Sequence, residues 1–67
     1  MTLTHREREV LAYLAHGLTG EQAAARLEIA PSTVKNHTRS AFRRLGVVNK
    51  VSAFRVLGWL TPPRVGP

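Results

Sequence analysis

Residues 31–45 read PSTVKNHTRSAFRRL, and at the periodicity of an α-helix they separate into two sides. One side has the spacing i, i+4, i+7, i+8 and i+11 that is typical of burial, with Val34, Thr38, Ala41, Phe42 and Leu45. The other side carries Ser32, Lys35, Asn36, Arg39 and Arg43. We predict one helix, about 21 Å long at ~1.5 Å per residue, that buries the first side and exposes the second.

The cationic side of this helix has two interpretations. Lys and Arg on an outer helix side are most often a solvated surface. A solvated helix, however, usually mixes charges of both signs and gains support from Glu–Lys pairs, whereas this chain has no acidic residue after Glu28. A major groove about 12 Å wide admits one helix. We therefore interpret residues 31–45 as a recognition helix for double-stranded DNA.

The net charge of +6 is distributed unevenly along the chain. Residues 1–30 hold three Arg against four Glu, a balance of −1, while residues 31–67 hold seven Lys and Arg and no acid, a balance of +7. This polarity indicates a directed cationic surface, and nucleic acid is the commonest polyanion that such a surface binds.

Length and composition limit the other classes of protein. With 67 residues the chain has room for one small domain, and without Cys it has neither a disulfide nor a thiolate zinc site. No signal peptide is visible, and no apolar run approaches the ~18 residues of a membrane span. We expect a cytoplasmic protein without a cofactor or a membrane partner.

Three further helices are predicted from their capping residues. Thr4 and Glu7 have the spacing of a capping box, and they open a helix over residues 5–16 that Gly17 ends. Thr19 and Gln22 repeat the device for a short helix ending near Leu27. A turn over residues 28–30 then leads to Pro31 at the first position of the recognition helix. This succession is typical of a helix-turn-helix.

The fourth predicted helix covers residues 50–60, from the N-cap Asn49 to the stop at Thr61, and completes an all-α, compact four-helix domain over residues 1–61. Residues 62–67 are expected to be a disordered tail. Ala53, Val56, Leu57 and Leu60 are predicted to point inward, and Val51, Gly58 and Trp59 largely outward. Two interpretations of the outward group stay open, because Trp59 either covers the core or belongs to a surface for self-association. The second gives a homodimer interface with Val51, Phe54, Arg55, Gly58 and Trp59.

Several separated motifs resemble the LuxR/GerE-type DNA-binding domain of bacterial transcription regulators. They are LTHREREVL at 3–11, GLT at 17–19, AARL at 24–27, TVKNH at 33–37 and RLGV at 44–47. The resemblance extends from Leu3 to about Leu60. It implies a helix-turn-helix whose third helix enters the major groove and whose fourth helix commonly mediates dimerisation.

Carried over by position, the resemblance implies base contacts for Lys35, Asn36 and Arg39. It implies phosphate contacts for Thr33, Lys35 and Arg43, and for the start of the second helix near Thr19. The charge of Arg44 and Lys50 and the position of His37 add these residues to the expected phosphate contacts.

Three positions depart from the family pattern. Ala23 replaces a larger aliphatic residue, Glu28 stands where Gly is common, and Ala30 replaces the usual Ser N-cap. The last two are each expected to cost about 1 kcal/mol, Glu28 on the condition that its φ is positive.

Other functions have weaker support in the sequence. His5, His16 and His37 lack the spacing of metal ligands, and no Ser, His and acid grouping is implied, so catalytic and metal sites are not expected. A module that holds RNA polymerase or another protein, like sigma region 4, is the main alternative. A membrane-surface helix at 50–60 has only the cations Lys50 and Arg55 and is disfavoured.

Overall fold

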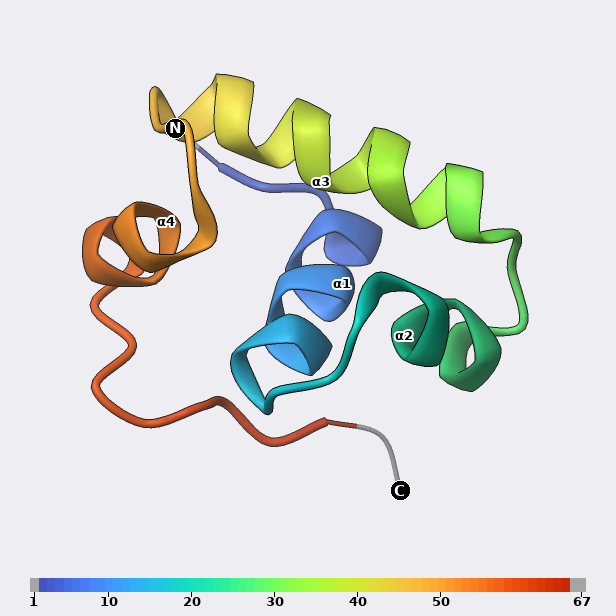
Figure 1. Cartoon of the computed structure of the whole chain (residues 1–67). Helices are drawn as coiled ribbons and strands as arrows, with labels where there is room; N and C mark the ends of the chain where they lie inside the picture. Colours follow the sequence, from blue (N-terminus) through green and yellow to red (C-terminus); the bar gives the residue numbers. More distant parts are fainter. Residues whose placement is uncertain (1, 66–67) are drawn as a thin grey trace.

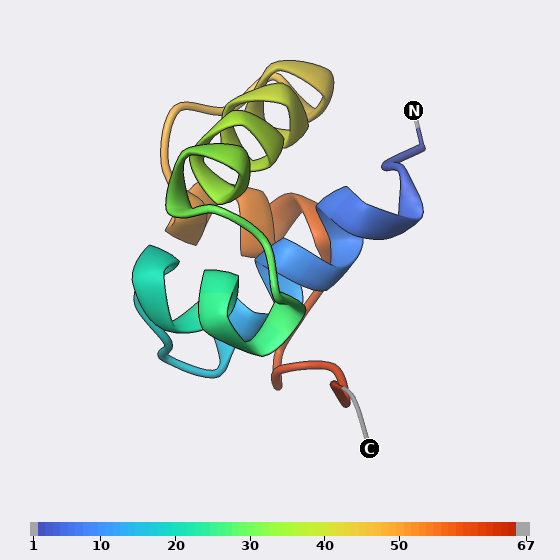
Figure 2. The same cartoon turned by 90° about the vertical axis from the view of Figure 1, so that its right-hand side faces the viewer.

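The computed structural model describes residues 2–65, and within them the chain forms four α-helices and no strand. These are α1 (His5–Ala15), α2 (Gly20–Leu27), α3 (Pro31–Leu45) and α4 (Lys50–Leu57). Figure 1 shows α1 at the centre, with α2 and α4 on either side of it and α3 lying across all three. The perpendicular view in Figure 2 also places α3 on one outer side of the molecule. The predicted all-α, four-helix fold is confirmed.

The first two helices start with capping boxes, as predicted. The Thr4 hydroxyl accepts from the Glu7 backbone N–H at 3.1 Å, and the Glu7 carboxylate accepts from the Thr4 N–H at 2.9 Å. Thr19 and Gln22 make the same two hydrogen bonds, at 3.1 and 2.9 Å. Since the first N–H groups of a helix have no partner inside it, these bonds fix where α1 and α2 begin.

Two of the three departures from the family pattern lie in the turn between α2 and α3. Glu28 has φ +57° and ψ +44°, and it is the one residue other than Gly with positive φ among residues 2–65. Ala30 occupies the N-cap of α3 and provides no side-chain hydrogen bond. The start of α3 therefore depends on Pro31 and on tertiary packing rather than on a capping side chain.

The fourth helix is shorter than predicted. It starts as expected, with the Asn49 side chain accepting from the Ser52 N–H at 2.8 Å. It ends at Leu57 instead of residue 60, because Gly58 takes the left-handed conformation at φ +73° that closes a helix. The C-cap explains why Gly stands at this position.

Three apolar residues at and after the end of α4 differ from their predicted orientation. Trp59 is half-buried and stacks on Phe54 with ring centroids 5.8 Å apart, so its predicted outward orientation is wrong and it covers the core. Val56 and Leu60 were predicted to point inward, but they are 59% and 100% exposed. Ala53 is fully buried, as predicted.

The core consists of two clusters that α1 joins. The first contains Val10, Tyr13, Ala23, Ala24 and Val34, and the second contains Leu3, Leu11 and Ala41. α2 contributes only alanines to the buried set, and α3 contributes Val34 and Ala41. One side of α3 is thus fixed against the other helices while the opposite side is left out of the core.

The described part of the C-terminal tail returns along α1. The Nε2–H of His16 donates to the Pro63 carbonyl at 2.6 Å, and Val65 packs against the first core cluster. These contacts were not predicted. The domain boundary at residue 61 and the disorder of residues 62–67 stay predictions, and residues 66 and 67 lie outside the described residues.

Candidate nucleic-acid interface

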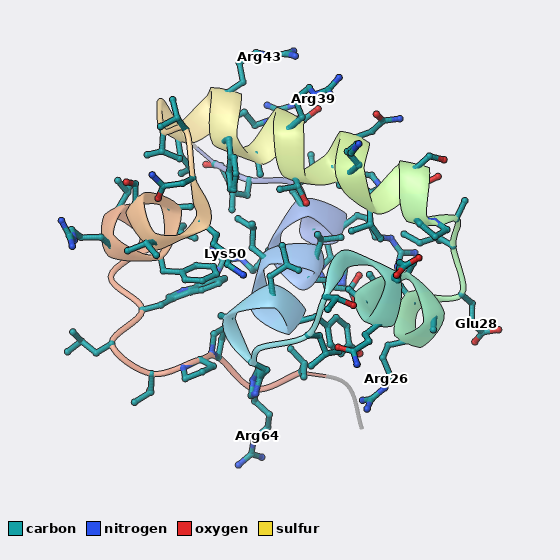
Figure 3. All side chains as sticks on the ribbon, in the orientation of Figure 1. Arg26, Glu28, Arg39, Arg43, Lys50 and Arg64 are labelled. Carbon is teal, nitrogen blue, oxygen red and sulfur yellow. The ribbon has the colours of Figure 1, made fainter. Side chains whose placement is uncertain are left out.

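The outer side of α3 presents its cations to solvent. Val34 and Ala41 are buried on the inner side, whereas Lys35, Asn36, Arg39 and Arg43 are exposed. Figure 3 shows Arg39 and Arg43 extending from α3 away from the other helices. The sequence-predicted base-contacting residues therefore lie together on the side of α3 that the fold does not use.

No acidic side chain pairs with these cations among residues 2–65. The ion pairs there join Glu9 to His5 at 3.6 Å and to Arg6 at 3.5 Å, and Glu7 to Arg44 at 3.2 Å. Lys35, Arg39 and Arg43 take part in none of them. Their charge is therefore free to attract an anion from solution.

Arg44, the neighbour of Arg43, lies on the α1 side of α3. Its Nε lies 3.2 Å from both carboxylate oxygens of Glu7, whose side chain is only 3% exposed. Burial by itself raises the pKa of Glu7, but the backbone N–H of Thr4, the Arg44 guanidinium and the Thr4 hydroxyl together lower it below its usual value. This pair links the first turn of α1 to the last turn of α3.

The pair was missed at the level of sequence. The sequence predicts only a capping-box role for Glu7 and a phosphate contact for Arg44. The two residues are 37 positions apart, and the sequence alone shows only that their charges are opposite. The phosphate contact of Arg44 stays a prediction.

The other expected phosphate contacts fall into two groups. Thr19, at the start of α2, and Lys50, at the start of α4, line one groove together with Lys35, Arg39 and Arg43. Thr33 and His37 are half-buried residues of α3 that do not line this groove. The Thr19 hydroxyl already accepts from the Gln22 N–H, so its oxygen caps α2.

The residues of the expected dimer interface differ in their exposure. Val51 is 60% exposed and Arg55 is exposed, while Phe54 and Trp59 are half-buried and stack on each other. Val48 at 89%, Val56 and Leu60 add exposed apolar surface around α4 that the sequence did not predict. The exposure of Leu60 follows from the turn at Gly58, after which the chain is no longer helical.

Groups that could hold a metal ion and helices that could span a membrane are both absent from residues 2–65. Between residues 2 and 65, no three His, Asp or Glu side chains are grouped so that they could hold a metal ion. None of the helices in that range has both the length and the apolar character to cross a bilayer.

Known proteins share both the sequence and the fold of this chain. The family model described as bacterial regulatory proteins, luxR family, matches residues 1–57. The probable transcriptional regulatory protein SgaR of Hyphomicrobium methylovorum is 50% identical over 52 residues, which are 78% of this chain and 25% of SgaR. The chain thus spans a quarter of the length of that relative.

Two solved structures superpose with a TM-score of 0.79 each. The response regulator ChrA of a heme-sensing two-component system is 38% identical, and the match covers 87% of this chain and 29% of ChrA. The transcription factor GerE is 31% identical, and the match covers 90% of this chain and 91% of GerE. ChrA and SgaR carry this unit within longer chains, whereas in GerE it makes up nearly the whole chain. The chain belongs to the luxR family of bacterial regulatory proteins and has the GerE-type helix-turn-helix fold.

Proposed function

We propose that this domain binds double-stranded DNA in a sequence-specific way with α3 in the major groove. The observation that carries the proposal is the row of exposed cations on the outer side of α3, which no acid pairs with in residues 2–65. The domain acts either as a free-standing regulator or as the DNA-binding end of a longer one, in the cytoplasm where bacterial DNA lies.

Affinity and specificity come from different side chains in this proposal. Arg43 and Lys50, with Thr19, Thr33 and His37, lie against phosphates, where the cations release counterions and give a salt-sensitive affinity. Lys35, Asn36 and Arg39 reach base edges. Arg and Lys suit the N7 and O6 atoms of guanine, and Asn suits the N7 and N6 atoms of adenine.

A single small domain contacts only a short stretch of DNA. A dimer that forms through α4 would contact two half-sites and therefore a longer stretch. Exposed apolar side chains surround α4, with Val48, Val51 and Val56 all above half exposure. Together with Phe54, Arg55, Gly58 and Trp59 they form the proposed interface. Two copies joined there would set their recognition helices about 34 Å apart, which is one turn of DNA.

The test is selection from a randomised duplex library at two salt concentrations, followed by titration of the enriched duplex. An enriched motif of two half-sites is expected. Arg39→Ala should weaken binding to it about tenfold or more and relax the preference at one base pair. Arg26→Ala is the matched control, because Figure 3 shows Arg26 on the part of α2 away from α3.

Two results would contradict the proposal. One is a library without enrichment at either salt concentration. The other is an equal loss of affinity in Arg39→Ala and Arg26→Ala, since that would reduce the interaction to net charge. Sedimentation with only one protomer on a two-half-site duplex would contradict the dimer alone. Contact with RNA polymerase stays a prediction, and a pull-down with the DNA-bound protein tests it.

A further inference from the structure

A groove of about 810 Å³ lies along α3, and its lining combines apolar residues with several of the proposed DNA contacts. It extends from the start of α2 to the start of α4. Its floor is apolar and includes Leu14, Val34, Phe42 and Val47. The proposed DNA contacts are all polar or cationic side chains, and none of them belongs to this floor.

The groove is open at its α2 end because one residue there has no side chain. This residue is Gly20, the first of α2, which lines the groove. A Cβ built on Gly20 would meet only Val34 Cγ1, at 3.9 Å, which is an ordinary van der Waals contact. Gly20 therefore leaves open a space that a larger residue would occupy.

The charges around the groove are not symmetric. At the end near α2, Glu21 and Lys35 both line it, so an acid offsets the base there. At the end near α4, Arg43 and Lys50 line it without an acid. Figure 3 shows Lys50 directed from the start of α4 toward the space beneath α3. Arg39 lines the groove between these two ends, so the groove joins an apolar floor to a cationic part that has no acid.

We propose that this groove binds a small amphipathic carboxylate. The carboxylate lies at Lys50, and the apolar body runs over Phe42 and Val34 toward Gly20. From Val34 to Phe42 the helix rises about 12 Å, and the groove volume falls within the ~300–1,000 Å³ of small-molecule sites. The site shares Lys50 with the proposed phosphate contacts but also needs the apolar floor, so it is tested in the absence of DNA.

The test is titration of the ¹⁵N-labelled domain, without DNA, with decanoate below its micelle concentration. Saturable shifts are expected at the amides of Gly20, Val34, Phe42 and Val47. Gly20→Leu fills the floor and should weaken decanoate at least about tenfold, while Gly20→Ala, which adds one carbon, should retain most of the affinity. Lys50→Gln should weaken it about fivefold, and Arg26→Gln, outside the groove, should not change it.

Several outcomes would overturn the proposal. These are no saturation by decanoate, equal binding of decyltrimethylammonium, shifts confined to the exposed Val51 and Val56 side of α4, or unchanged affinity in a folded Gly20→Leu variant. Shifts at the groove that depend on protein concentration alone would assign it to a second copy of the chain. Since no duplex is present, none of these results bears on the proposed DNA binding.

Discussion

Arg43 and Arg44 are neighbours in α3, yet they belong to two different sides of it. Consecutive helical residues point about 100° apart, and this rotation sends Arg44 toward the buried carboxylate of Glu7 and Arg43 toward solvent. The first arginine is available to a polyanion, and the second holds α1 to α3. A count of charges along the chain does not distinguish these two roles. Experiments that change one side of α3 at a time can distinguish the outer side from the side that faces α1.

The largest effect is expected on the α1 side, from Glu7→Ala. This variant removes half of the capping box and leaves Arg44 without its partner, which should cost about 3 kcal/mol of the free energy of unfolding. Urea unfolding measures the loss. Glu9→Ala is the control, because Glu9 pairs with His5 and Arg6 at partly exposed positions and should change stability by less than about 0.5 kcal/mol. Equal losses in the two variants would refute a special role for the α1 side.

The same carboxylate gives the α1 side a dependence on pH. The pKa of Glu7 is lowered in the folded chain, so the stability that it contributes is complete above the unfolded pKa of about 4.3. It should be lost as the pH falls below that value and through the lower folded pKa. Urea unfolding between pH 3 and 7 should show a shallower acid loss for Glu7→Gln than for the natural sequence. Parallel curves for the two proteins would exclude this contribution.

Arg43→Ala and Arg44→Ala compare the two sides directly. Arg43→Ala should lower the salt dependence of DNA binding by about 0.9 in log K against log salt, with a stability change within about 0.5 kcal/mol. Arg44→Ala should leave that slope unchanged and lose about 1–2 kcal/mol of stability, because Glu7 then stays buried without its cation. A reduced slope in Arg44→Ala would show that Arg44 contacts phosphate, as the sequence predicted.

Helix starts could be predicted because their signals are local. Each predicted N-cap side chain accepts a hydrogen bond from the backbone N–H three residues later. All three of these bonds are formed, at Thr4, Thr19 and Asn49. The end of α4 was missed for a reason of the same kind. Gly58 is a stop signal like Gly46, but Trp59 and Leu60 continue the apolar spacing and Pro62 offers a later stop. The helix ends at the left-handed Gly58 although the apolar spacing continues beyond it.

The outer side of α3 could also be predicted, since helical periodicity alone separates its exposed cations from Val34 and Ala41. Contacts between distant residues could not. The Glu7–Arg44 pair and the His16–Pro63 hydrogen bond join positions 37 and 47 residues apart, and they depend on how α1 packs against α3 and the tail. The groove at Gly20 likewise depends on all four helices at once.

The smallest effect is expected at Glu28, which precedes α3 and belongs to neither of its sides. Its left-handed backbone is strained for a residue with a Cβ, so Glu28→Gly should stabilise the domain by about 0.5–1 kcal/mol. Glu28→Ala separates backbone from charge, because it also removes an acid from the C-terminal end of α2 but retains the Cβ. Thermal unfolding should therefore rank Gly above Ala. If both variants gain equally, the charge and not the backbone accounts for the cost. DNA affinity should be unchanged in both, because Glu28 is remote from Arg39 and Arg43 in Figure 3 and lines no part of the groove along α3.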